Sequence, residues 1–177
     1  VMQALLDLGI ADASARAAGL KVWKVAMPWP LEAQGLRGFA AGCEELLVVE
    51  EKRALIEAQL KEALYPLAER PRVVGKTDEQ GAPLVPDYGE ITPASCARLI
   101  AARLKRWAGR APDARGALSD ELVARLDAQL ARLDAKEHRV APLPATIERI
   151  PYFCSGCPHN TSTRVPEGSR ALAGIGC

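Results

Sequence analysis

Two closely spaced cysteines near the C-terminal end carry the clearest chemical pattern in this sequence. Cys154 and Cys157 enclose Ser155 and Gly156. A C-x-x-C pair can place two thiolates on one metal ion or cluster, and the glycine lets the backbone turn so that both sulfurs point inward. Cys177 follows twenty positions after Cys157, in a run of small residues that permits close backbone approach. Two cysteines and a distant third indicate a soft metal site for which one ligand is missing from the sequence.

The spacing alone leaves four interpretations of this pair open. It can ligate an iron–sulfur cluster, or it can form a zinc knuckle that His159 completes. It can be a thioredoxin-type redox pair, but that motif opens a helix directly after a strand, and Pro151 and the linker before it fit poorly. The fourth interpretation is a pair of buried cysteines without a ligand. Cys43 and Cys96 stand among Ala and Leu in helical patterns, so we interpret both as small buried apolar residues.

Composition narrows the class of protein that positions these residues. The 177 residues include 23 basic and 22 acidic side chains, so no charge excess points to nucleic acid. Apolar residues make up 49% and aromatic residues only 5%, which favours helical and α/β architecture over a β-sandwich. We expect no membrane span, because the apolar runs are short, and with no signal peptide visible we expect a cytoplasmic location. The odd number of unevenly spaced cysteines is poor evidence for disulfides.

Helical and strand patterns alternate over residues 1–108. The expected helices cover residues 1–8, 12–18, 53–65 and 92–107 with a short one within 31–42, and the expected strands cover residues 20–27, 46–49 and 72–76. Thr92 and Pro93 are typical of a helix entry, with Thr92 as N-cap. Strands that alternate with helices predict an α/β fold with a parallel sheet covered by helices. Three strands make a small sheet, so we expect the sequence to begin partway into a domain.

Residues 109–149 read as a linker that contains one amphipathic helix. Ser119 is the expected N-cap, and Asp120 and Glu121 follow in the first turn. The apolar stripe of this helix consists of Leu118, Leu122, Leu126, Leu130 and Leu133. The stripe is narrow, which fits either docking on a neighbouring domain or subunit or plain core packing. Residues 141–150 are an extended linker with prolines, and neither end of the sequence reads as a natural terminus, so we expect an internal fragment.

The C-terminal motif resembles one protein family in particular. Phe153-Cys-Ser-Gly-Cys-Pro-His-Asn-Thr-Ser-Thr163, followed by Ala173-Gly-Ile-Gly-Cys177, is similar to the start of the thiamine-diphosphate-binding domain of indolepyruvate ferredoxin oxidoreductases in their long fused form. These belong to the thiamine-diphosphate-dependent 2-oxoacid:ferredoxin oxidoreductases. The segment from Gly19 to Leu31 and the run Glu45-Leu-Leu-Val-Val-Glu-Glu51 look like the transketolase C-terminal-like domain that precedes it in that family.

The resemblance implies a division of the chain and a set of ligands. Residues 1–108 would be a truncated transketolase C-terminal-like domain, residues 109–149 the linker, and residues 150–177 the start of the thiamine-diphosphate/[4Fe-4S] domain. Cys154, Cys157 and Cys177 would be three ligands of a [4Fe-4S] cluster, with the fourth beyond the sequence. His159 and the backbone of Gly174 and Gly176 would lie beside the thiamine diphosphate, which the family binds with Mg²⁺ through motifs outside this sequence.

The resemblance also implies a reaction and its partners. It is the oxidative decarboxylation of an aryl 2-oxoacid, with indolepyruvate as the expected substrate, to an acyl-CoA. Coenzyme A and ferredoxin would be the partners, and the enzyme would be a homodimer. The fragment alone is expected to be inactive. The alternative is a non-catalytic α/β interaction module that carries a zinc-knuckle-like cysteine site.

Overall fold

The computed structural model describes residues 1–108, 119–139 and 153–169 of the chain. The chain divides into two compact units, Val1–Arg139 and Val140–Cys177. Each unit is described by itself. The predicted extended linker, residues 141–150, lies outside the described residues, as do Leu118, Gly174, Gly176 and Cys177.

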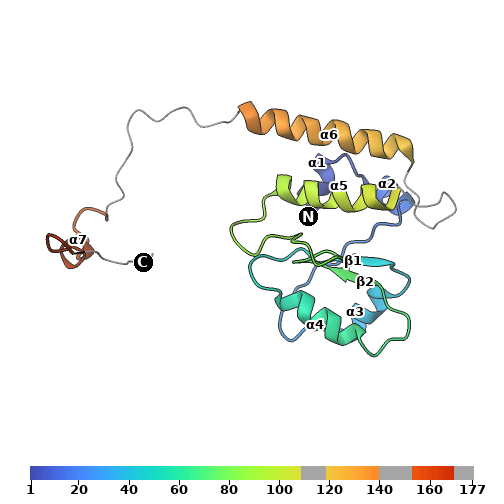
Figure 1. Cartoon of the computed structure of the whole chain (residues 1–177), viewed down its shortest axis with the longest axis horizontal. Coiled ribbons are helices and arrows are strands. Elements are labelled where there is room, and N and C mark those ends of the chain that lie inside the picture. Colours follow the sequence, from blue (N-terminus) through green and yellow to red (C-terminus); the bar gives the residue numbers. More distant parts are fainter. Residues whose placement is uncertain (109–118, 140–152, 170–177) are drawn as a thin grey trace. The chain divides into compact units, whose positions relative to one another are not determined.

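The N-terminal unit contains a parallel pair of strands between two groups of helices (Figure 1). Its elements are α1 (Met2–Asp7), α2 (Asp12–Ala17), α3 (Ala33–Ala40), β1 (Glu45–Leu47), α4 (Leu55–Leu64), β2 (Arg72–Val74), α5 (Pro93–Ala108) and α6 (Asp120–Arg139). β1 and β2 pair with Glu45 opposite Arg72 and Leu47 opposite Val74, and α4 forms the crossover between them. The predicted α/β class and the parallel pairing are therefore confirmed.

Alternate side chains of β1 and the residues after it enter two different hydrophobic clusters, as the twofold period of a strand requires. Leu46 and Val48 join a cluster with residues of α3 and α4, such as Leu36 and Leu64. Leu47 and Val49 pack against the other cluster, on the opposite side of the sheet. That second cluster is built from α1, α5 and α6, and its fully buried members include Leu8 and Leu126.

The strand predicted for residues 20–27 is wrong. This segment is irregular, and among the described residues the sheet contains only β1 and β2. Lys21, Val22 and Trp23 are all exposed, so the alternation of polar and apolar residues does not produce a buried and a solvated face. A period of two predicts a strand only where a neighbouring strand supplies hydrogen bonds, and this segment has none among the described residues.

Helix boundaries follow the predicted capping residues closely. Thr92 Oγ1 accepts a hydrogen bond from the backbone N–H of Ser95 at 3.1 Å, at the start of α5. Ser119 Oγ accepts one from the N–H of Leu122 at 3.2 Å, at the start of α6. Gly9 and Gly19 follow α1 and α2 with φ of +68° each, a conformation that glycine adopts without strain. Cys43, in contrast, lies beyond the end of α3 rather than within a helix.

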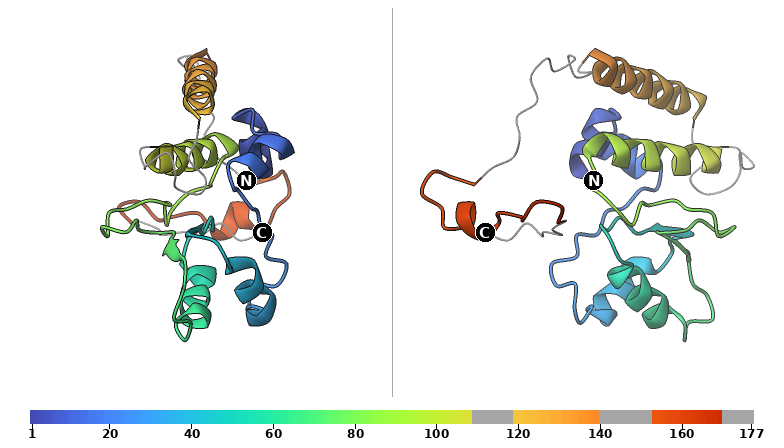
Figure 2. Two further views of the ribbon diagram at one scale, coloured as in Figure 1. Left: turned by 90° about the vertical axis from the view of Figure 1, so that its right-hand side faces the viewer. Right: turned by 60° about the vertical axis from the view of Figure 1, so that its left-hand side comes forward.

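The leucine stripe of α6 is part of a hydrophobic core. α6 lies along α5 in Figure 1 and in the right-hand view of Figure 2, and Leu122 and Leu126 are buried in the cluster with α1 and α5. Leu130 and Leu133 are partly buried against the same cluster. Arg98 of α5 adds ion pairs of 2.6 Å to Asp134 and to Glu137 of α6. The stripe therefore packs within the N-terminal unit. None of the helices in the described ranges combines the length and apolar character needed to cross a membrane.

Candidate functional site

The C-terminal unit presents the predicted cysteine pair on a tight turn. The N–H of Cys157 donates to the carbonyl of Cys154 at 3.0 Å, which closes the turn. Gly156 has a φ of +80°, and no atom lies within 4 Å of where its Cβ would be, so the requirement for glycine here is conformational. The thiol of Cys154 is exposed and that of Cys157 is half-buried. The turn thus keeps both sulfurs available to a ligand.

His159 lies against Cys157. Its Nδ1 is 3.2 Å from Cys157 Sγ, close enough for a hydrogen bond in which the thiol donates to the ring in one tautomer and the ring N–H donates to sulfur in the other. The ring of Phe153 stacks on the imidazole with centroids 5.2 Å apart and an interplanar angle of 29°. Phe153 and Cys157 together fix the orientation of His159 on the surface of this unit.

The short helix α7 (His159–Ser162) supports the turn from its C-terminal side. Asn160 donates its side-chain N–H to the carbonyl of Cys154 at 3.0 Å and its backbone N–H to the carbonyl of Cys157 at 3.1 Å. Thr163 Oγ1 donates to the carbonyl of His159. Asn160 therefore contacts both ends of the C-x-x-C turn, a supporting role that the motif alone did not indicate.

Three of the six predicted site residues lie together in this unit. They are Cys154, Cys157 and His159, while Gly174, Gly176 and Cys177 lie outside the described residues. Within residues 1–108, 119–139 and 153–169 no group of three or more His, Cys, Asp or Glu side chains is arranged to hold a metal ion. The described segment therefore supplies a pair of soft donors with a neighbouring imidazole.

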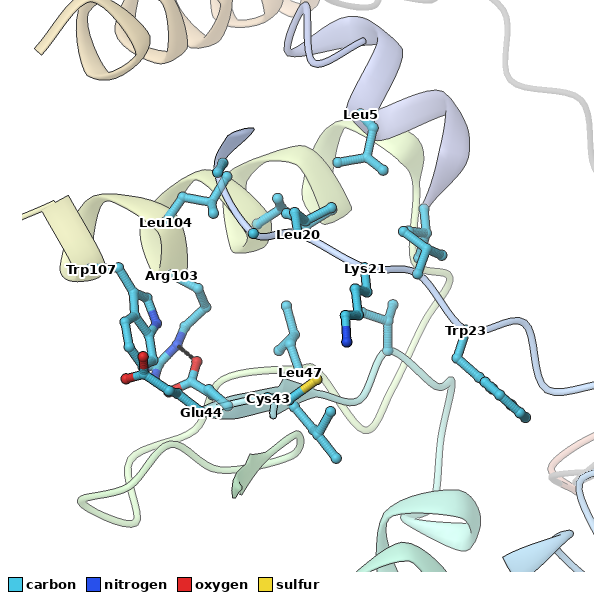
Figure 3. Close-up of a pocket in the computed structure, with 18 of the residues that line it drawn as sticks. Leu5, Leu20, Lys21, Trp23, Cys43, Glu44, Leu47, Arg103, Leu104 and Trp107 are labelled. Atoms are coloured by element: carbon cyan, nitrogen blue, oxygen red, sulfur yellow. Dashed lines mark hydrogen bonds and ion pairs between the residues drawn. The ribbon is translucent and has the colours of Figure 1, made fainter. Parts of the chain in front are cut away.

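A second candidate site lies in the N-terminal unit, and no pattern in the sequence predicts it. A half-open pocket of about 480 Å³ lies between the segment after α2, β1 and α5 (Figure 3). Its wall is mostly apolar and includes Leu20, Leu47, Leu104 and Trp107. This volume is within the range of small-molecule sites. The pocket gathers residues that are more than a hundred positions apart in the sequence, such as Val1 and Trp107, and local sequence patterns do not reveal such tertiary packing.

A buried arginine forms one end of this pocket. Arg103 of α5 donates from Nε to Glu45 of β1 at 2.8 Å and from a terminal nitrogen to Glu79 at 3.0 Å. The Arg103 side chain is only 9% exposed, and its partners are 7% and 13% exposed. Arg106 adds a further ion pair to Glu79. Because both carboxylates meet Arg103, this cluster holds α5 on β1 and on the loop after β2.

A second polar cluster anchors the loop beyond the carboxyl end of β2. Glu57 of α4 accepts the backbone N–H of Lys76 at 2.8 Å and the Lys61 ammonium at 2.6 Å. Burial by itself raises the pKa of Glu57, but these two hydrogen bonds together with the positive charges of Lys61 and Lys76 outweigh it and bring the pKa below its ordinary value of 4.5. A Cβ on Gly75 would collide with the Glu57 carboxylate, so glycine is required there by close approach.

Comparison with known proteins returns one family. The model of the indolepyruvate oxidoreductase domain matches residues 1–129, which form most of the N-terminal unit. The match does not extend to the cysteine turn. No curated protein and no solved structure shows a significant similarity to the chain.

Proposed function

Because the chain belongs to the indolepyruvate oxidoreductase domain family, we propose that it is part of an enzyme that oxidatively decarboxylates an aryl 2-oxoacid, with indolepyruvate as substrate. The carboxylate leaves as carbon dioxide, and the remaining acyl group is joined to the sulfur of coenzyme A. Two electrons are released in this conversion, and ferredoxin accepts them one at a time. The observation that carries the proposal is the family match over residues 1–129, which marks the chain as an oxidoreductase family member.

The cysteine turn supports the redox part of the proposal. Cys154 and Cys157 are soft donors on one turn, exposed and half-buried, which fits thiolate ligation of iron. We propose that they ligate a [4Fe-4S] cluster together with Cys177 and a fourth residue outside the sequence. When bound, such a cluster supplies a one-electron acceptor beside the site of decarboxylation. Asn160 keeps the turn closed through its hydrogen bonds to both cysteine carbonyls.

Thiamine diphosphate with Mg²⁺ is the second proposed cofactor. It supplies the carbanion chemistry that decarboxylation of a 2-oxoacid requires. We propose that His159, Gly174 and Gly176 lie beside it. Of these, the described residues include only His159, whose imidazole is exposed and is oriented by Phe153 and Cys157. An exposed, oriented imidazole is suited to donate or accept a proton at a bound ligand.

We propose further that the N-terminal unit has the role of a transketolase C-terminal-like domain in a fused, homodimeric enzyme. The parallel order of β1 and β2 with the α4 crossover supports an α/β domain of this kind. Residues 1–177 would then be an internal part of the enzyme and inactive alone, because the diphosphate and magnesium motif lies outside them.

Turnover by the full-length protein tests the proposed reaction. Under anaerobic conditions, indolepyruvate and coenzyme A should reduce ferredoxin, and omission of coenzyme A should prevent acyl-CoA formation. Cys154→Ala should abolish ferredoxin reduction, whereas Cys43→Ala, in the other unit, should leave it unchanged. Reduction of ferredoxin by Cys154→Ala at the wild-type rate would disprove the role of the cysteine turn.

One observation favours a second function, a zinc-knuckle-like interaction module. The 3.2 Å approach of His159 Nδ1 to Cys157 Sγ brings an imidazole to the cysteine pair, and Cys₂His sites bind zinc. A colourless protein with one zinc per chain and no ferredoxin reduction would support this alternative. The two functions are distinguished by metal content and by turnover.

A further inference from the structure

The proposed function assigns no role to the pocket in the N-terminal unit, and the chemistry of its lining differs from that of the cysteine turn. It is bounded by the irregular segment that follows α2, by β1 and by α5. Figure 3 shows Leu20, Leu47 and Leu104 around the same space, with Trp107 at one end and Trp23 at the other. The sheet leaves this side of β1 open, because among the described residues its only strand neighbour is β2.

Apolar side chains form the body of the pocket. Leu47 extends from β1 and Leu104 from α5, and both pack at the edge of the hydrophobic cluster of α1, α5 and α6. Ile100 is buried and also lines the pocket. A ligand that fills this space would therefore need an apolar body, because a polar one would lose its hydration without new hydrogen bonds.

Charged side chains lie at the two opposite ends of the pocket. At the Trp107 end, Arg103 is already paired with Glu45 and Glu79, so it offers no free charge to a ligand. At the other end, the ammonium of Lys21 points into the pocket (Figure 3). Within the described ranges no carboxylate or other acceptor pairs with Lys21. A cation beside an apolar surface is complementary to an anion with an apolar body.

We propose that this pocket binds a small organic monocarboxylate with an apolar body, whose carboxylate meets Lys21 and whose apolar part lies between Leu47 and Leu104. The volume of about 480 Å³ accommodates a medium-chain fatty acid such as octanoate. The proposal does not depend on the oxidative reaction, because it concerns binding in the N-terminal unit alone.

Tryptophan fluorescence provides a direct test. The sequence contains three tryptophans, of which Trp23 and Trp107 line the pocket and Trp29 does not. In a Trp29→Phe background the emission therefore reports on the pocket. Octanoate is the probe, and 1-octanol is its uncharged counterpart. We expect a saturable blue shift with octanoate and a dissociation constant about tenfold weaker for octanol, as a charge-assisted hydrogen bond contributes.

A matched pair of variants tests the role of the ammonium. Lys21→Met retains the apolar stem and removes the charge, and it should weaken octanoate binding about tenfold and abolish the preference over octanol. Lys24→Met is the control, because Lys24 is exposed but does not line the pocket, and it should bind like wild type. Circular dichroism checks that both variants fold. Equal affinity for octanoate and octanol in the wild-type chain, or no saturable shift, would overturn the proposal without any variant.

Discussion

Replacement of Arg103 by methionine should destabilise the N-terminal unit strongly. Arg103 is 9% exposed and pairs with two carboxylates that are 7% and 13% exposed. Methionine fills much of the same space but leaves buried Glu45 with a single long ion pair, to Arg72 at 3.9 Å, while Glu79 keeps its ion pair with Arg106. Removal of one partner from a buried ion pair costs about 3–5 kcal/mol, and we expect the lower end of this range because Arg72 and Arg106 still compensate part of the buried charge.

Arg98→Met is the matched control on the same helix. Arg98 also pairs with two carboxylates, Asp134 and Glu137, at 2.6 Å each, so the number of ion pairs lost is similar. Its side chain is 39% exposed and its partners are each 54% exposed. Water solvates these groups when the pairs are lost, and the expected cost is about 0–1 kcal/mol.

Urea unfolding at neutral pH, followed by circular dichroism, measures both costs. With a urea dependence of about 1–3 kcal/mol per molar, Arg103→Met should lower the midpoint by roughly 1 M or more. Arg98→Met should move it by a few tenths of a molar. The double variant Arg103→Met/Glu45→Leu should recover part of the loss, because both charges are then removed. Equal midpoints for the two single arginine variants would refute the assignment of Arg103 to a buried pair.

Two further perturbations test the packing and the titration of the same unit. Because the pKa of Glu57 is lowered by folding, its contribution to stability is present above pH 4.5 and is lost as the pH falls through the folded pKa. Glu57→Gln should therefore lower the free energy of unfolding at pH 7 and weaken its decrease at acidic pH. Urea unfolding that shows the same decrease at acidic pH as the wild type would argue against this. Leu126→Ala, at a fully buried position of α6, should cost about 2–5 kcal/mol in urea unfolding. Leu130→Ala, at a partly buried position, should cost less, and equal losses would show that α6 is not packed as described.

Much of the helical structure could be predicted from the sequence, because the signals are local. Thr92 and Ser119 accept the capping hydrogen bonds expected of them, and Gly9 and Gly19 end their helices with positive φ. Cys96 is buried, as its apolar neighbours predicted.

The sequence pattern alone could not show that residues 20–27 do not form a strand. Alternation describes one segment, whereas a strand also needs a partner for its backbone, and here that space beside β1 is a pocket. The contact of Arg103 with Glu45 and Glu79 was equally hidden, because it joins residues 58 and 24 positions apart. Long-range pairs of this kind depend on the tertiary fold.

The cysteine turn shows a mixed outcome. The sequence predicted Cys154 and Cys157 as cluster ligands and His159 beside the thiamine diphosphate; the structure places His159 against Cys157, and the ligand roles stay predictions. The part played by Asn160 was missed, although Asn is a residue that commonly bonds to nearby backbone carbonyls. Ligation by Cys177 stays a prediction, since it lies outside the described residues.

The iron and sulfide content of the full-length protein tests the central claim most directly. After anaerobic reconstitution with iron and sulfide, we expect about four iron and four sulfide per chain and a brown, oxygen-sensitive protein, as a [4Fe-4S] cluster requires. Cys154→Ala should lose this content, whereas Cys43→Ala should keep it. One zinc per chain, with no sulfide and no difference between the two variants, would contradict the account.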